Sequence, residues 1–269
     1  MKIILCFCMA LLLFAVPARA ETVKIGGSGS MIPLLTEMSK AYMKKHPHDT
    51  IVVNQRSMGQ PGGIAALLSG AVDIAMSARE LSPEQKKLPV QEIEIARVAG
   101  VVAVSGNVTV KGITSQQLCD IYSGKITNWK QVGGADARIL VLTRPESDST
   151  KLFFRRAFTC MARLEESPNV LDLPKSQDMH NALLTKQNAI GPVDTIAFAK
   201  AAGKYKALRI DNKGFEGMQS GQWPFVHHNC LVLGNNRGEA VKRFLHFIRS
   251  PEGQAIIKAD KGVPVAFSF

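Results

Sequence analysis

Several motifs that carry nucleotide binding or catalysis are missing from this 269-residue sequence. No Gly-Lys-Ser/Thr follows a glycine-rich turn, and no Gly-x-Gly-x-x-Gly run occurs, which argues against nucleotide binding. The Gly-x-Ser-x-Gly elbow of serine hydrolases is also absent, and no serine is linked to a histidine in a motif that would activate it. The sequence therefore gives little support to a hydrolase.

Metal-binding patterns are absent as well. Cys119, Cys160 and Cys230 are too widely spaced to form a metal cluster. The histidines at 46 and 48, and at 227 and 228, lack the spacing of one helical turn. We expect these histidines at the surface or at strand ends, and we expect no metal or other cofactor.

Long apolar runs are confined to the N-terminus. Lys2 precedes an apolar core over 3–16, and Ala18-Arg19-Ala20 has the small residues of a cleavage site. Residues 1–20 are therefore predicted to be a signal peptide that is cleaved after Ala20, and the bacterial periplasm is the expected location. Cleavage would leave three cysteines, enough for one disulfide and one thiol in an oxidising compartment.

Positive charge is in excess but is not concentrated. Removing Lys2 and Arg19 leaves 33 − 2 = 31 basic residues against 22 acidic ones, a formal charge of 31 − 22 = +9. No basic tract with interleaved aromatic residues occurs, so nucleic-acid binding is disfavoured. A solvated basic surface accounts for most of the charge, although an acidic ligand is also compatible with it.

Short apolar runs alternate with amphipathic segments along the chain, which predicts an α/β fold with parallel sheets covered by helices on both faces. Two runs are long, 93–104 and 225–233. We interpret them as crossings between two lobes, with 21–104 and 223–269 forming lobe 1 and 105–222 forming lobe 2. The alternative is that both runs are central strands of one sheet, since periodicity does not distinguish the two.

The segment Thr143–Lys151 is the strongest functional signal. Its residues 144–150 contain one arginine and three hydroxyls, between an apolar run over 139–142 and a helical pattern over 152–158. The first turn of a helix has backbone N–H groups without partners, and these groups bind anions. Arg144 would add a forked positive charge suited to an oxyanion. Taken alone, the segment is equally compatible with an ordinary capped loop.

A second segment has the same character. A short apolar run over 22–25 is followed by Gly26-Gly27-Ser28-Gly29-Ser30-Met31 and then by a helical pattern that starts near Pro33. Glycine allows the backbone to approach a ligand closely, and the hydroxyls can donate to it. Two such turns together favour a small-anion site over a nucleotide site.

These segments give the sequence a resemblance to the periplasmic phosphate-binding proteins of ABC-type transporters. The resemblance rests on the Gly27–Ser30 turn, on 62–81, on 122–134, on 144–150 and on Ser250-Pro251-Glu252-Gly253-Gln254, which together span nearly the whole chain after residue 20. It implies a two-lobed periplasmic-binding-protein-like fold (type II) with an anion cleft between the lobes. It also implies a monomer that delivers inorganic phosphate to a membrane ABC permease.

The resemblance implies roles for individual residues. Asp73 would accept a hydrogen bond from a protonated oxyanion and so favour phosphate over sulfate. Glu146 would hold the guanidinium of Arg144, and Ser77 and Arg79 would either line the cleft or form a strand-terminal turn. The expected anion-binding residues are Ser28, Ser30, Met31 (through its amide), Ser57, Gln60, Asp73, Arg144, Ser147, Ser149 and Thr150.

Two segments depart from the family pattern: Asp148-Ser149-Thr150 stands where the family has Ser-Gly-Thr, and Gly59-Gln60-Pro61-Gly62-Gly63 stands where it has Gly-Ser-Gly-x-Gly. Asp148 replaces a serine and brings a negative charge toward the anion. Gln60 takes the place of a second serine, with Ser57 nearby as a substitute. These changes leave open whether Asp148 points away, accepts from a more protonated ligand or weakens phosphate binding. They also leave open a second function, binding or sensing of another oxyanion without transport, and a third, hydrolysis of a phosphate ester.

Overall fold

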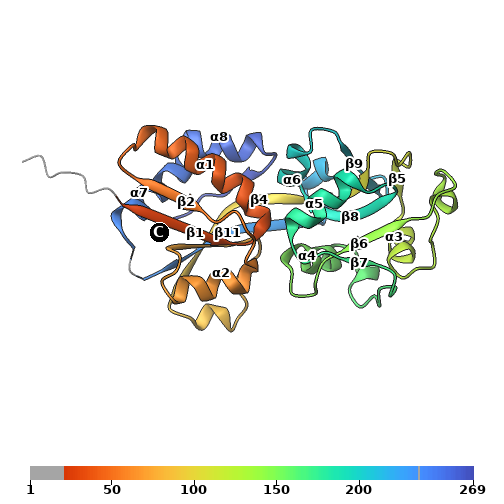
Figure 1. The fold of residues 1–269 in the computed structure, drawn as a ribbon, viewed down its shortest axis with the longest axis horizontal. Helices are drawn as coiled ribbons and strands as arrows, with labels where there is room; N and C mark the ends of the chain where they lie inside the picture. The colour runs from red at the N-terminus through yellow and green to blue at the C-terminus, as the bar shows by residue number, and fades with distance from the viewer. Residues whose placement is uncertain (1–20, 236) are drawn as a thin grey trace, which may run out of the picture.

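The computed structural model describes residues 21–235 and 237–269, and the predicted signal peptide lies outside this range. The chain forms two α/β halves that lie side by side along the long axis of the molecule (Figure 1). The strands are β1 (Thr22–Gly27), β2 (Thr50–Val53), β3 (Ile74–Ser77), β4 (Val90–Ser105), β5 (Gly112–Ile113), β6 (Leu140–Thr143), β7 (Leu171–Asp172), β8 (Ala189–Asp194), β9 (Tyr205–Ala207), β10 (Arg209–Ile210), β11 (Val226–Gly234) and β12 (Val263–Pro264).

Eight α-helices and five short 3-10 helices occur in the described residues. The α-helices are α1 (Ile32–Lys45), α2 (Gly59–Leu68), α3 (Ser115–Tyr122), α4 (Ser149–Ala157), α5 (Ser176–Thr185), α6 (Thr195–Lys200), α7 (Glu239–Arg249) and α8 (Pro251–Ala259). The 3-10 helices are η1 (Gly29–Met31), η2 (Gln85–Lys87), η3 (Trp129–Val132), η4 (Thr159–Met161) and η5 (Phe215–Met218). None of the helices in the described ranges is long and apolar enough to cross a membrane.

The main sheet is continuous through β4. Its order is β2-β1-β3-β11-β4-β8-β6-β7, with β9 and β12 also paired to β4. Strand β4 pairs with β11 from Val90 to Ala99 and with β8 from Gly100 to Val104, and it lies between these two strands in the sheet. One long strand therefore belongs to both halves, as Figure 1 shows.

The prediction of parallel sheets was wrong for the centre of the sheet. The outer pairs β1–β2, β1–β3, β6–β8 and β6–β7 are parallel. The pairs β3–β11, β11–β4 and β4–β8 are antiparallel. The reason is topological, because β11 returns the chain from the second half alongside β4, which carried it there. Long apolar runs are typical of buried strands of either direction, so the sequence did not distinguish them.

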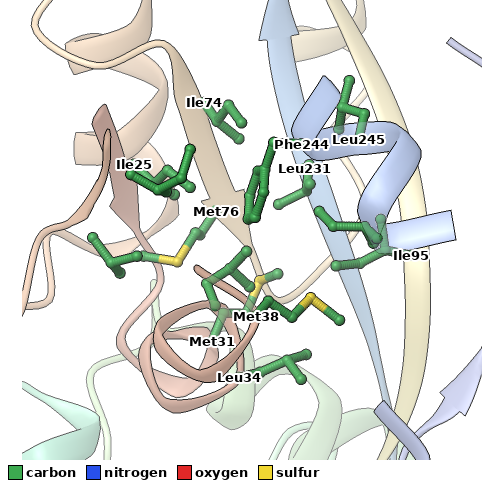
Figure 2. Packing of buried hydrophobic residues seen from close by; sticks show 14 of the residues in the cluster. Ile25, Met31, Leu34, Met38, Ile74, Met76, Ile95, Leu231, Phe244 and Leu245 are labelled. Carbon is green, nitrogen blue, oxygen red and sulfur yellow. The ribbon is translucent and has the colours of Figure 1, made fainter. Parts of the chain in front are cut away.

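The core of the first half lies between this sheet and α1, α7 and α8. Alternate residues of β1 are buried, and α1 adds an apolar face that includes Leu34 and Met38. Both side chains belong to a buried cluster that also contains Phe244 of α7 and Leu231 of β11 (Figure 2). On the opposite face of the sheet, α2 packs through a smaller apolar cluster around Ile64.

The second half has an apolar cluster on each face of its sheet. One cluster joins α3 and α4 to the strands and contains Trp129, Phe154 and Phe225. The other joins α5 and α6 to the strands and contains Met179 and Tyr205. The change from the first core to the second occurs between Val98 and Ala99 of β4. The lobe boundaries after 104 and before 223 remain a prediction, and the packing points to a crossing slightly earlier in β4.

A disulfide ties α3 to the segment after α4. Cys119 and Cys160 are bonded, with their Cα atoms 6.1 Å apart, and Cys230 is a free, buried thiol on β11. Burial raises the pKa of the Cys230 thiol well above its usual value. The sequence predicted that three cysteines could form one disulfide and leave one thiol. Which two cysteines are bonded could be read only from the structure.

Reduction of this disulfide should destabilise the protein. The bond spans 41 positions of sequence, and bonds that close loops of this size contribute about 2–4 kcal/mol. The variant Cys119→Ala/Cys160→Ala should lower the free energy of unfolding in guanidinium by that amount. Adding a reductant should destabilise the parent and leave the variant unchanged. Identical unfolding midpoints for the oxidised and reduced parent would contradict this.

Candidate functional site: an anion-binding cleft between the two halves

A cleft of about 260 Å³ lies between the two halves of the molecule. Its first wall comes from the turns after β1 and β2, and its second wall comes from the turns after β6 and β7. In parallel sheets the carboxyl ends of the strands form one edge, where ligands bind. The lining residues are Ser28, Gly29, Ser30, Ser57, Met58, Gly59, Gln60, Pro61, Arg144, Pro145, Ser147, Asp148, Ser149, Thr150, Pro174, Lys175 and Ser176.

Four helical N-termini border this cleft. The η1/α1 segment and α2 begin there in the first half, and α4 and α5 begin there in the second half. Side-chain caps are absent at the starts of η1, α2 and α5. Within the described part of the chain, the following lining residues have backbone N–H groups with no protein acceptor: Gly29, Ser30, Gln60, Ser149, Thr150 and Ser176.

Unpaired amides of this kind are donors available to an anion, and the partial positive charge of each helix N-terminus adds to the attraction. Because the amides come from both halves, an anion held by them would connect the two halves. The arrangement suits a small ion that can accept hydrogen bonds from many directions.

Arg144 is the buried cation of the cleft. It follows β6, and only 3% of the residue is exposed. Its Nη1 donates to the carbonyl oxygen of Leu173 at 2.6 Å, and its Nη2 donates to Asp148 Oδ2 at 2.6 Å. These two contacts fix the plane of the guanidinium at the cleft wall.

Asp148 has two partners at this wall. Besides accepting from Arg144, its carboxylate caps α4, because Oδ1 accepts from the backbone N–H of Lys151 at 3.2 Å. The side chain is 18% exposed and lines the cleft. The carboxylate therefore faces the same kinds of donor, a guanidinium and a helix N-terminus, that an oxyanion would use.

The residues of the first half contribute hydroxyls and amides. Ser28 is buried, and its Oγ accepts from the backbone N–H of Ala78 at 3.2 Å, so the hydroxyl proton is available to a ligand. Ser57 and Ser30 line the cleft beside it. The side chain of Gln60 is engaged elsewhere, since its Nε2 donates to Ser77 Oγ at 2.8 Å and its Oε1 accepts from Arg79.

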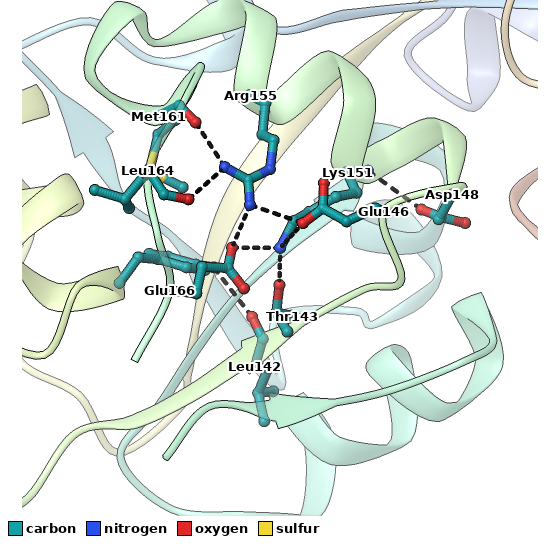
Figure 3. A network of polar contacts seen from close by, with 10 residues as sticks. Leu142, Thr143, Glu146, Asp148, Lys151, Arg155, Met161, Leu164 and Glu166 are labelled. Carbon is teal, nitrogen blue, oxygen red and sulfur yellow. Dashed lines mark hydrogen bonds and ion pairs between the residues drawn. The ribbon is translucent and has the colours of Figure 1, made fainter. Parts of the chain in front are cut away.

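Behind the arginine turn lies a network of buried charges (Figure 3). Lys151 of α4 is 1% exposed, and its ammonium group donates to Glu166 and to Thr143. Arg155 donates to the carbonyl oxygens of Met161 and Leu164 at 2.8 and 2.9 Å. These contacts hold the start of α4 against β6 and so fix the turn that carries Arg144.

Three expected site residues lie elsewhere. Glu146 does not hold Arg144, because its carboxylate accepts from Arg155 at 2.7 Å and its side chain is 66% exposed. Asp148 has that role instead. The loop turns between the two acids, so only the later one faces the guanidinium.

Asp73 is also outside the cleft. It is exposed and accepts from the backbone N–H of Lys24 at 2.7 Å. It precedes β3 and therefore lies at the amino end of that strand, whereas the cleft borders the carboxyl ends. Met31 is likewise excluded, because it belongs to the apolar core and its N–H donates to Ser28 O at 3.2 Å.

The structure brings the other predicted residues together, but the start of α5 was missed as part of the cleft wall. The cleft contains Ser28, Ser30, Ser57, Gln60, Arg144, Ser147, Ser149 and Thr150. Lys175 and Ser176 at the start of α5 were not predicted. Strand β7 before them has two residues, too few for a periodic signal, although the turn chemistry of Pro174-Lys175-Ser176 marks a helix start.

His227 is the second residue of β11, which fits the expected strand-end position, but the residue is buried and not at the surface. It is 1% exposed on β11, and neither ring nitrogen has a hydrogen-bond partner among the described residues. Burial lowers the pKa of His227 to about 4, so its ring is neutral near neutral pH. His228 is half-buried, and its Nδ1 contacts Glu94 Oε1 at 2.7 Å. No grouping of three metal-ligating side chains occurs in the described ranges.

The Lys151–Glu166 pair should matter for stability. Removing one member of a buried ion pair leaves an uncompensated charge and costs about 3–5 kcal/mol. Glu166→Gln should lower the free energy of unfolding, measured with urea, toward that range. A matched control is Glu216→Gln, which breaks an ion pair with Arg209 whose side chains are both 55% exposed. The control should cost less than about 1 kcal/mol, and equal costs for both variants would contradict the role of the buried pair.

The two-lobed fold and the cleft are those of a class of ligand-binding proteins, and comparison with known families identifies it. A family model described as the PBP superfamily domain matches residues 15–251. The chain belongs to this superfamily. Within it, the chain is similar to proteins named phosphate-binding protein PstS.

Three relatives illustrate the similarity. PstS of Staphylococcus epidermidis is 30% identical over 85% of this chain and 74% of its own length. PstS of Bacillus subtilis is 29% identical over 90% of this chain and 80% of its own length. A solved structure from Clostridium perfringens, assigned as a phosphate ABC transporter substrate-binding protein and containing bound phosphate, has a TM-score of 0.81. It is 29% identical and covers 91% of this chain and 100% of its own length.

Proposed function

We propose that this protein binds inorganic phosphate in the cleft between its two lobes and delivers it to a membrane ABC permease. The observation that carries the proposal is the set of unpaired backbone amides from both halves, which face one cleft together with the buried Arg144. A tetrahedral oxyanion has enough acceptor oxygens to pair with donors from both walls. The PstS relatives and the phosphate-bound neighbour support phosphate as the ion.

The site residues follow from the same geometry. Arg144 supplies charge, and the amides of Ser149 and Thr150 supply donors from the second lobe. The hydroxyls of Ser28, Ser30 and Ser57 supply donors from the first lobe. Binding in this way would draw the lobes together, because each lobe satisfies part of the ion. Lobe 1 would comprise 21–104 and 223–269, and lobe 2 would comprise 105–222.

The proposal includes a cellular setting. The protein would be exported, lose residues 1–20, and act as a monomer in the periplasm. It would bind phosphate without converting it, as a carrier and not an enzyme. Assay of the purified protein with a chromogenic phosphate ester tests this last point, since turnover above that of buffer would favour a hydrolase. Loss of phosphate uptake in a deletion strain, restored by the gene, tests transport against sensing.

Arg144→Ala should weaken phosphate binding at least tenfold, because a charge-assisted contact contributes about 1.5–3 kcal/mol. Titration calorimetry measures the effect. The variant should also unfold at a lower temperature, because Asp148 and the carbonyl group of Leu173 lose their partner. The calorimetry is therefore done at a temperature where circular dichroism shows the variant folded.

The matched control is Arg163→Ala. It removes an exposed arginine of the same lobe that does not line the cleft, so phosphate affinity should stay within about twofold of the parent. Arg144→Lys keeps the charge but not the fork and should fall between the two. An Arg144→Ala variant that is folded and binds phosphate as tightly as the parent would remove Arg144 from the site.

A further inference from the structure

Asp148 gives the cleft a fixed negative charge at the position where an anion is expected. Among the lining residues, Arg144 and Lys175 contribute two formal positive charges and Asp148 contributes one negative charge, so the sum is 2 − 1 = +1. Asp148 is the one acidic side chain in that lining. The formal charge of the wall therefore matches a single negative charge on the ligand better than two.

We propose that Asp148 acts as a charge filter, making the cleft selective for singly charged oxyanions, so that phosphate binds as its monoanion. The inference rests on the proposed function and names the ionisation state of its ligand. The carboxylate already holds Arg144 at 2.6 Å and the amide of Lys151 at 3.2 Å. An entering oxyanion shares these donors with a neighbouring carboxylate, and each further negative charge on the ligand is repelled by it.

The carboxylate cannot leave the site easily. Asp148 is the N-cap of α4, so rotating its side chain out of the cleft would leave the Lys151 amide without its acceptor. It would also leave the nearly buried Arg144 without its carboxylate partner. The negative charge of Asp148 therefore stays beside the anion in the bound state. Selection against doubly charged anions requires this.

Other charged or titratable groups interact with Asp148, and their contribution to the pH dependence of phosphate affinity must be separated from that of Asp148. Burial lowers the pKa of Arg79, after β3, but an arginine keeps its charge throughout the useful pH range. His227 of β11 is neutral above its pKa of about 4. Burial raises the pKa of Asp194, at the end of β8, to about 7. The phosphate affinity of a variant is therefore divided by that of the parent at the same pH. Both proteins carry these other groups, so their contributions cancel to first order in this ratio.

The test is Asp148→Ser, titrated by calorimetry with inorganic phosphate at about pH 6 and about pH 8, and with sulfate at both. Serine caps a helix as well as aspartate does, so α4 keeps its start. Near pH 6 phosphate is mostly a monoanion, and near pH 8 mostly a dianion. Sulfate is a dianion throughout.

The affinity gain of Asp148→Ser over the parent should be about tenfold larger for phosphate at the higher pH than at the lower one. For sulfate the gain should be about tenfold at both values. Glu146→Gln is the matched control. It removes the neighbouring acid of the same loop, which lies outside the cleft lining, so its affinities should follow those of the parent at both pH values.

Two results would overturn the charge filter while leaving the proposed function intact. One is a phosphate affinity of Asp148→Ser that equals that of the parent at both pH values. The other is a gain that is the same for monoanion and dianion, which would mean that Asp148 acts through shape and not through charge. A parent that binds no phosphate at either pH would refute the proposed function itself, and the two failures are thus distinguishable.

Discussion

The constraint on which this structure depends is that the strands next to the cleft end at one place. The carboxyl ends of strands β1, β2, β6 and β7 all lie at the cleft, and a helix begins after each strand. Because the first turn of a helix leaves N–H groups unpaired, the fold gathers donors there without needing a specialised side chain. The antiparallel pair β4–β11 makes this possible by carrying the chain out to the second half and back.

Buried charge keeps the second wall rigid. Arg144 is held between a carbonyl oxygen and Asp148, and Lys151 is held between Glu166 and Thr143 (Figure 3). Each ion is buried with an acid beside it, as the high cost of an unpaired buried charge requires. A wall built in this way does not need to reorganise when an anion arrives, so more of the interaction free energy appears as affinity.

Much of the candidate site could be predicted, and the errors have physical causes. Ser28, Ser30 and Arg144 stand in turns between an apolar run and a helical pattern, and such turns lie at the carboxyl ends of strands. The prediction for Asp73 was wrong because this carboxylate precedes β3. A residue before a strand lies at the opposite edge of the sheet from a residue that follows the strand. Glu146 and Asp148 are two positions apart, and only the course of the loop decides which of them reaches Arg144.

The sequence by itself determined the local elements. Apolar runs specified the positions of β1, β4 and β11, because a strand of this kind depends on neighbouring residues. Only the tertiary structure decided the antiparallel centre of the sheet, the Cys119–Cys160 pairing, the burial of His227 and the place of Lys175 in the cleft. These features depend on contacts between residues far apart in the chain, and no local pattern encodes which distant segments meet.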